Sequence, residues 1–244
     1  MVEIRKLTKH GEFADAVHLQ KEIWGFADVE LLPLRLFVVA GKIGGQVLGA
    51  FDESRMVAFC LAIPGLKPGG KYYLHSHMLG VLPEYRNSGL GRQMKLKQRE
   101  EALERDIDLI EWTFDPLELK NAYFNIERLG AIVRRFVRNQ YGSTSSHLHS
   151  GLPTDRCTAE WWINSDRVRR ILSGELDDSI AIKETVAVPA NIAELRRADP
   201  ARARQVQIEV GSSFDRFFSR GLSAVRFETT DENGNYRLGE WAIE

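Results

Sequence analysis

The chain lacks several features that would assign it to a specialised class of protein. It has only two cysteines, Cys60 and Cys157, so it contains neither a disulfide framework nor the cysteine spacing of a zinc site. No stretch approaches the roughly 18 apolar residues of a membrane span, and residues 1–6 do not resemble the apolar region of a signal peptide. We therefore expect a reduced, cytoplasmic protein with no membrane partner.

An excess of charge of one sign is also missing. The 33 Lys and Arg residues balance 34 Asp and Glu residues, and the formal net charge of −1 gives no basic field that would favour nucleic acid as a partner. Hydrophobic residues make up 43% and charged residues 27%, as in ordinary globular proteins. A chain of 244 residues can form one large or two small domains with a proper core, and the composition leaves a homodimer open.

Hydrophobic periodicity predicts an α/β fold in the first two thirds of the chain. Apolar or alternating runs predict strands over 2–7, 46–52, 56–63, 72–82, 109–114, 132–137 and 158–163. Helical spacing predicts helices over 13–24, 31–40, 89–105 and 117–129. The predicted order over residues 1–164 is therefore β-α-α-β-β-β-α-β-α-β-β.

The last 80 residues, 165–244, are predicted to form an extension packed on this core rather than a free domain. Asp199-Pro200 is typical of a helix start, and an apolar stripe then runs to Gly221. Two strands, over 222–228 and 236–243, are predicted to flank a turn at residues 233–235. The extension is thus a helix followed by a β-hairpin.

The most informative segment joins the strand over 72–82 to the helix over 89–105. It reads Arg86-Asn87-Ser88-Gly89-Leu90-Gly91, followed by Arg92. Such a turn aims backbone N–H groups at one point, at the positive end of the helix dipole, and so favours an anion. The glycines carry no Cβ that would keep a phosphate away, and the arginines add charge. The alternative is an ordinary turn whose glycines serve packing alone.

This Arg-x-x-Gly-x-Gly pattern, after the strand that ends Leu79-Gly80-Val81, resembles the pyrophosphate loop of the GNAT acyl-CoA-dependent N-acyltransferases. The resemblance implies a mixed central sheet with splayed strands flanked by helices, with residues 1–164 as the acyl-CoA-binding catalytic core. It implies acetyl-CoA or another acyl-CoA as co-substrate, and no metal. The cofactor-binding residues that it implies on this strand and loop are Met78, Leu79, Gly80, Val81, Arg86, Asn87, Ser88, Gly89, Leu90, Gly91 and Arg92.

His75 and His77 precede the loop on the same strand. Residues i and i+2 of a strand share a face, so both side chains are predicted to point the same way. An imidazole with a pKa of about 6.5 suits a general base near neutral pH. The pair resembles the two strand histidines of serotonin N-acetyltransferases. Two alternatives remain: half of a metal site, which neither cysteine is placed to complete, and core histidines satisfied by their neighbours.

The helix over 117–129 carries the residues that should meet the leaving thiolate. In the GNAT family a tyrosine commonly stands four residues before a glycine such as Gly130, but here that position is Ile126. Tyr123 is therefore our candidate proton donor, and the adjacent Asn125 could donate to the sulfur instead. Asn121 and Asn125 are further cofactor contacts. A thiolate of pKa about 8.5 can also leave without an acid. The alternative for Tyr123 is core packing.

Further motifs resemble one bacterial GNAT subgroup, which includes N-succinyltransferases associated with N-succinylamino acid racemases. They are the run from Trp112 to Leu117, Tyr141-Gly142, and Pro153 with Asp155-Arg156. The resemblance implies transfer of an acetyl or succinyl group to the primary amine of a small molecule, in particular an amino acid.

Arginines beyond the loop could then receive the carboxylate of the amino acid. The candidates are Arg134, Arg138 and Arg156, with Arg135 as a further possibility, and plain surface arginine is the alternative for each. A protein or peptide N-acetyltransferase and a non-catalytic acyl-CoA-binding regulator are the alternative functions.

Overall fold

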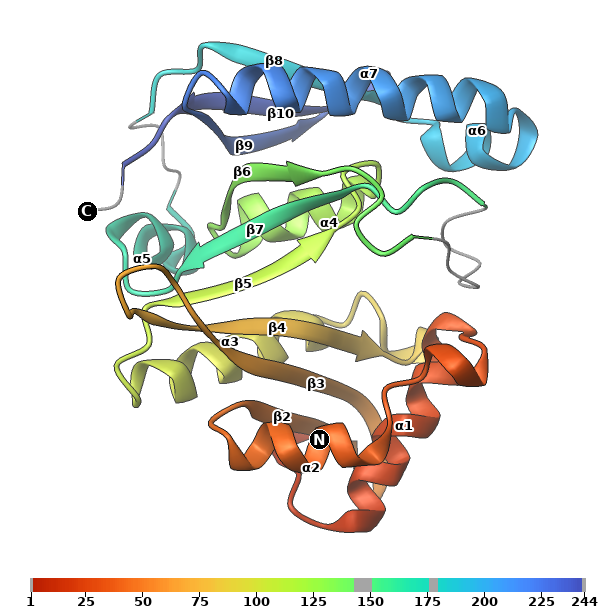
Figure 1. Cartoon of the computed structure of the whole chain (residues 1–244), viewed down its shortest axis with the longest axis vertical. Coiled ribbons are helices and arrows are strands. Elements are labelled where there is room, and N and C mark those ends of the chain that lie inside the picture. The colour runs from red at the N-terminus through yellow and green to blue at the C-terminus, as the bar shows by residue number, and fades with distance from the viewer. Residues whose placement is uncertain (1, 143–150, 176–179, 243–244) are drawn as a thin grey trace. The chain divides into compact units, whose positions relative to one another are not determined.

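The computed structural model describes residues 2–142, 151–175 and 180–242 of the protein (Figure 1). The described residues divide into two compact units, the first formed by residues up to Glu111 and the second by the residues from Trp112 onward. This division differs from the predicted boundary after residue 164. The second unit combines the last third of the predicted core with the whole extension.

The first unit has the predicted order of elements. They are β1 (Glu3–Lys6), α1 (His10–Trp24), a 3-10 turn (Asp28–Glu30), α2 (Leu34–Lys42), β2 (Gln46–Asp52), β3 (Arg55–Leu66), β4 (Tyr72–Val81), a second 3-10 turn (Pro83–Tyr85), α3 (Leu90–Leu103) and the first half of β5 (Leu109–Phe114). Strands β1 to β4 are antiparallel neighbours in sequence order, whereas β4 and β5 run parallel. The sheet is therefore mixed, as predicted.

Helices cover both faces of this sheet. In Figure 1, α1 and α2 lie on one face and α3 lies on the other. A strand covered on both faces has no solvated side, which explains why β2 and β3 read as continuous apolar runs. Cys60 on β3 is fully buried, and burial raises the pKa of its thiol.

The second unit is an antiparallel sheet with helices packed on it. Its elements after β5 are α4 (Leu119–Tyr123), a π-helical turn (Phe124–Arg128), β6 (Ile132–Val137), β7 (Arg156–Trp162), α5 (Asp166–Ser173), β8 (Glu184–Pro189), α6 (Ile192–Ala198), α7 (Pro200–Phe218), β9 (Leu222–Thr229) and β10 (Asn233–Glu240). Its strand order is β7-β6-β9-β10-β8. The single helix predicted over 117–129 is thus a short α-helix continued by a π-turn.

The extension continues the sheet of this unit, because β9 pairs with β6 at Val133 and Ala224. The start of α7 is as predicted: Asp199 caps the helix, and its Oδ1 accepts the N–H of Arg202 at 2.9 Å. The predicted hairpin turn at residues 233–235 is wrong. Gly234 lies inside β10, where a Cβ would stand 2.7 Å from the Phe227 ring, so this glycine serves packing and not chain reversal.

A buried ion pair ties the extension to the turn after β5. Arg196 on α6 donates from Nη2 to Oδ2 of Asp115 at 2.7 Å, and both side chains are about 5% exposed. Tyr236 on β10 adds a hydrogen bond from Oη to the carbonyl of Pro116 at 2.7 Å. Strand β8 and the helices α5 and α6 were not predicted. None of the helices in the described ranges combines the length and apolar character needed to cross a bilayer.

Candidate functional site

The turn between β4 and α3 is stabilised by hydrogen bonds from its own side chains and by residues with positive φ angles. Asn87 and Gly89 have positive φ angles of 61° and 86°, and Gly89 is the N-cap of α3. Ser88 donates from Oγ to the carbonyl of Tyr85 at 2.7 Å, and Arg86 donates from Nε to the carbonyl of Val81 at 3.2 Å. Residues 86–89 are exposed, so the positive end of the helix dipole opens onto solvent.

The two glycines of this turn are next to open space. Gly89 needs its positive φ, and a Cβ there would meet nothing within 4 Å. Gly91 has no such backbone demand, and its nearest neighbour would be Cδ2 of Leu79 at 4.0 Å. A glycine in a helix costs about 1 kcal/mol relative to alanine. Neither packing nor backbone conformation requires a glycine at position 91, and the open space beside it leaves room for a ligand to approach the backbone.

We expect Gly91→Asp to weaken binding of acyl-CoA about tenfold or more without loss of stability. The Cβ fits the open space, and a carboxylate at the second helical residue interacts well with the dipole but repels a pyrophosphate. Gly11→Asp is the matched control, because Gly11 is also a second helical residue, in α1, with nothing within 4 Å. Calorimetry that finds equal CoA affinities for both folded variants would remove the loop from the site.

The backbone of β4 is open toward β5 over its second half. Pairing between the two strands consists of Leu74 with Ile110 and His75 with Glu111. The later residues of β4 pair with β3. Within the described residues of the first unit, the other backbone edge of Met78–Val81 has no strand partner. Such an edge can pair with an extended ligand chain.

His75 and His77 lie close together on β4. Their ring centroids are 5.9 Å apart, with an angle of 43° between the ring planes. The alternation used in the prediction is interrupted, because Leu61 and Ala62 on β3 pair with Met78 and Ser76 and leave His77 as the extra residue of a bulge. Burial lowers the pKa of His77, since a low-polarity surrounding disfavours the imidazolium form. His77 is therefore neutral at pH 7, as a general base must be.

Glu111 on β5 is a further candidate site residue, which the sequence analysis missed. It is the parallel partner of His75, is 3% exposed, and accepts a hydrogen bond from Lys67 Nζ at 2.6 Å. The Lys67 ammonium also lies 4.5 Å from the centre of the Tyr73 ring. The signal available in the sequence was a single acidic residue inside the apolar strand over 109–114.

The face of β4 opposite to His75 carries a buried polar cluster. Ser76, between the two histidines, receives a hydrogen bond from Lys95 Nζ at 2.8 Å and donates to Gln98 Oε1 at 3.1 Å. Both partners belong to α3. Burial lowers the pKa of the Lys95 amine from its ordinary value of 10.5 to about 8. This cluster fixes β4 against α3 on the face turned away from His75.

Lys95→Met is expected to stabilise the protein by about 1–3 kcal/mol at pH 7. The pKa of the Lys95 amine is 10.5 in the unfolded chain and about 8 in the folded protein. The free-energy cost of burying its charge is therefore complete below pH 8 and disappears as the pH rises from 8 to 10.5. Urea unfolding at pH 7 and pH 10 should show the gain shrinking at the higher pH. Lys97→Met, an exchange of a partly exposed lysine of the same helix, should change stability by less than about 0.5 kcal/mol. A loss of stability in Lys95→Met at pH 7 would show that the buried charge is required.

In the second unit, the candidates from α4 differ in exposure. Tyr123 ends α4 and is 43% exposed, and Asn121 is exposed as well. Asn125 lies in the π-turn, is 3% exposed, and accepts a hydrogen bond from Trp112 Nε1 at 3.2 Å. Tyr123 is thus not a core residue. The side-chain oxygen of Asn125, by contrast, already accepts a hydrogen bond inside the core.

The candidate arginines have internal partners. Arg134 pairs with Glu160 at 2.7 Å, and Arg138 pairs with Asp215 at 2.7 Å. Arg156 donates from Nη1 to the carbonyl of Asp155, and burial lowers the pKa of its guanidinium. The two carboxylate pairs weigh against a substrate role for Arg134 and Arg138. The described residues hold no group of three or more His, Cys, Asp or Glu side chains arranged to bind a metal ion.

No protein-family model and no curated protein sequence matches the chain. Solved structures do match. The Escherichia coli ribosomal-protein-S18-alanine N-acetyltransferase is 18% identical with a TM-score of 0.53, over 68% of this chain and 96% of that chain. A putative acetyltransferase of the GNAT family from Desulfovibrio desulfuricans is 14% identical with a TM-score of 0.52, over 67% and 99%. Naa50 of Arabidopsis thaliana, solved with the bisubstrate analogue CoA-Ac-MVNAL, is 14% identical with a TM-score of 0.52, over 65% and 97%. The chain therefore has the GNAT fold, as the sequence predicted.

Proposed function

We propose that the protein is an acyl-CoA-dependent N-acyltransferase that acylates the primary amine of a small molecule. The observation that carries the proposal is Gly91, a helical glycine beside open space at the positive end of α3. The loop that leads to Gly91 follows β4, a strand whose edge is open over Met78–Val81. Acyl-CoA fits both features: its pyrophosphate would bind at the loop, and its extended pantetheine chain would pair with the open edge of β4.

In the proposed reaction the amine attacks the thioester carbonyl directly in a ternary complex. His77, neutral at pH 7, accepts the proton that the amine nitrogen loses as the C–N bond forms, with His75 beside it. The C–S bond then breaks and the thiolate of CoA leaves. Both cysteines are fully buried and burial raises the pKa of each thiol, which argues against a covalent cysteine intermediate.

Tyr123 remains our proposed donor of a proton to the leaving thiolate. Its exposed hydroxyl has the chemistry for this step, which the buried Asn125 is less suited to perform. Since a thiolate of pKa about 8.5 leaves without assistance at neutral pH, the contribution of Tyr123 is expected to be modest.

An amino acid that receives an acetyl or succinyl group is the proposed acceptor and Arg156 its proposed carboxylate partner. We expect faster turnover with free amino acids than with the matching amides, because one charge-assisted pair contributes about 1.5–3 kcal/mol. Succinyl-CoA is expected to serve at least as well as acetyl-CoA. Arg156→Gln should remove the preference for the free acid, whereas Arg135→Gln, on an arginine that shares Glu160 with Arg134, should keep it. Equal rates for acids and amides in the unaltered enzyme would contradict the carboxylate pair.

Release of free thiol from acetyl-CoA and succinyl-CoA with a panel of amines tests the proposed function. Amine-dependent release with small amines supports it. Release that requires peptides would identify a peptide N-acetyltransferase instead, and tight CoA binding with no release under any condition would identify an acyl-CoA-binding regulator.

A further inference from the structure

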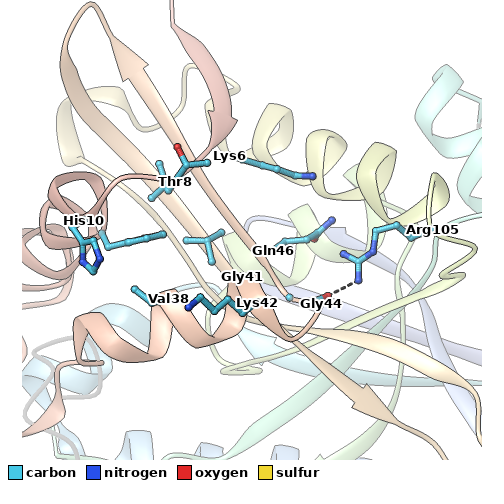
Figure 2. Close-up of a pocket in the computed structure, with 13 residues that line it drawn as sticks. Lys6, Thr8, His10, Val38, Gly41, Lys42, Gly44, Gln46 and Arg105 are labelled. Carbon is cyan, nitrogen blue, oxygen red and sulfur yellow. Dashed lines mark hydrogen bonds between the residues drawn. The ribbon is translucent and has the colours of Figure 1, made fainter.

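A cavity in the first unit lies apart from the β4–α3 turn. It has a volume of about 580 Å³, within the usual range for small-molecule sites. It lies where the end of β1, the start of α1, the end of α2 and the start of β2 meet (Figure 2). None of its lining residues belongs to β4 or to the loop over 86–92.

The lining of the cavity is basic. Lys6, Lys42 and Arg105 come from β1, α2 and the segment after α3, and the lining residues include no carboxylate (Figure 2). Lys6 is partly compensated by Glu101, with 3.4 Å between Nζ and Oε2. Arg105 donates to the carbonyl of Gly44. Lys42 has no ion-pair partner in the described ranges. The site therefore carries uncompensated positive charge.

Apolar and polar groups complete the lining. Leu7, Phe13, Val38 and Val47 contribute apolar surface. Gln46 lines the cavity, is 1% exposed, and uses its Nε2 to donate to the carbonyl of Gln98 at 2.9 Å. Its Oε1 is buried and has no hydrogen-bond partner among the described residues. A buried acceptor of this kind calls for a donor, which a bound hydroxyl supplies.

Gly41 leaves the cavity open at the end of α2. Gly41 lies within α2, lines the cavity, and would place a Cβ within 4 Å of nothing. Gly45, by contrast, packs so closely that a Cβ would stand 2.4 Å from the carbonyl oxygen of Ala62. Gly41 thus repeats the property of Gly91: neither packing nor backbone conformation requires a glycine there.

We propose that this cavity binds a small organic anion, a carboxylate or phosphate group attached to a compact apolar body. Lys6, Lys42 and Arg105 supply the charge-assisted contacts, and the apolar side chains of the lining enclose the body of the ligand. This binding is additional to the proposed transferase reaction and does not depend on it.

Three probes test the proposal by calorimetry: 4-hydroxybenzoate and phenyl phosphate as the two anion types, and 4-hydroxybenzamide as the uncharged match of the first. Saturable binding of at least one anion, about tenfold tighter than that of the amide, is the expected result. If neither 4-hydroxybenzoate nor phenyl phosphate binds more tightly than 4-hydroxybenzamide, or if neither anion shows saturable binding, the proposal is overturned.

Two matched pairs of variants locate the binding. Lys42→Gln should weaken binding about tenfold, whereas Arg35→Gln, an exposed cation of the same helix outside the cavity, should change it less than about twofold. Gly41→Leu should fill the cavity and abolish binding, while Gly11→Leu, at an equally open position that does not line it, should not. Thermal unfolding checks that the leucine variants stay folded. Equal losses within either pair, or loss in Arg86→Gln instead, would place the probe elsewhere and reject the site.

Discussion

Replacing both His75 and His77 with alanine is expected to lower turnover about 100-fold at pH 7, with acyl-CoA affinity nearly unchanged. The two rings lie 5.9 Å apart beside the open edge of β4, where an amine would meet a thioester. Steady-state kinetics with small amines and direct titration with CoA measure the two effects separately. His18→Ala, which removes an exposed histidine of α1, is the matched control and should leave turnover unchanged.

The pH profile separates a general base from a structural residue. Because burial lowers the pKa of His77, turnover of the unaltered protein should fall only below the ordinary histidine value of about 6.5. The loss in the double variant should be much smaller near pH 9, where more of the amine is already free. Unchanged turnover at pH 7 would make both histidines structural.

Removing the cation of the buried ion pair in the second unit should destabilise it by about 3–5 kcal/mol. Arg196→Met leaves Asp115 buried without its guanidinium partner, and Asp115 is only 6% exposed. Urea unfolding measures the effect. Arg197→Met, on the exposed neighbour of Arg196 in α6, should cost less than about 0.5 kcal/mol.

A double variant distinguishes an unpaired charge from lost packing. Asp115→Leu combined with Arg196→Met should recover part of the stability lost in the single variant, because the buried carboxylate that Arg196 balances is then removed as well. If the stability loss in the double variant equals the sum of the losses in Asp115→Leu and Arg196→Met, the two side chains act independently of each other.

The sequence by itself determined the elements of the first unit and the character of its loop. Local signals suffice there: apolar runs for buried strands, helical spacing for α1 and α3, and glycines at Gly89 and Gly91 where a strand meets a helix. The GNAT fold itself was expected from the resemblance of the strand and loop over 79–91 to that family, and the predicted order of the elements agrees with it. The proximity of His75 and His77 also followed, although the bulge at His77 did not.

Only the tertiary structure decided which polar residues are buried together. Glu111 is paired with His75 by the register of β4 and β5, and Arg196 reaches Asp115 across 81 positions of the chain. The partners of Arg134 and Arg138, the interior position of Gly234 in β10, and the basic cavity around Lys42 likewise depend on segments far apart in sequence. The physical reason is that periodicity reports which face of one element is apolar. Ion pairs and cavities depend instead on the register and packing of several elements, to which no local pattern corresponds.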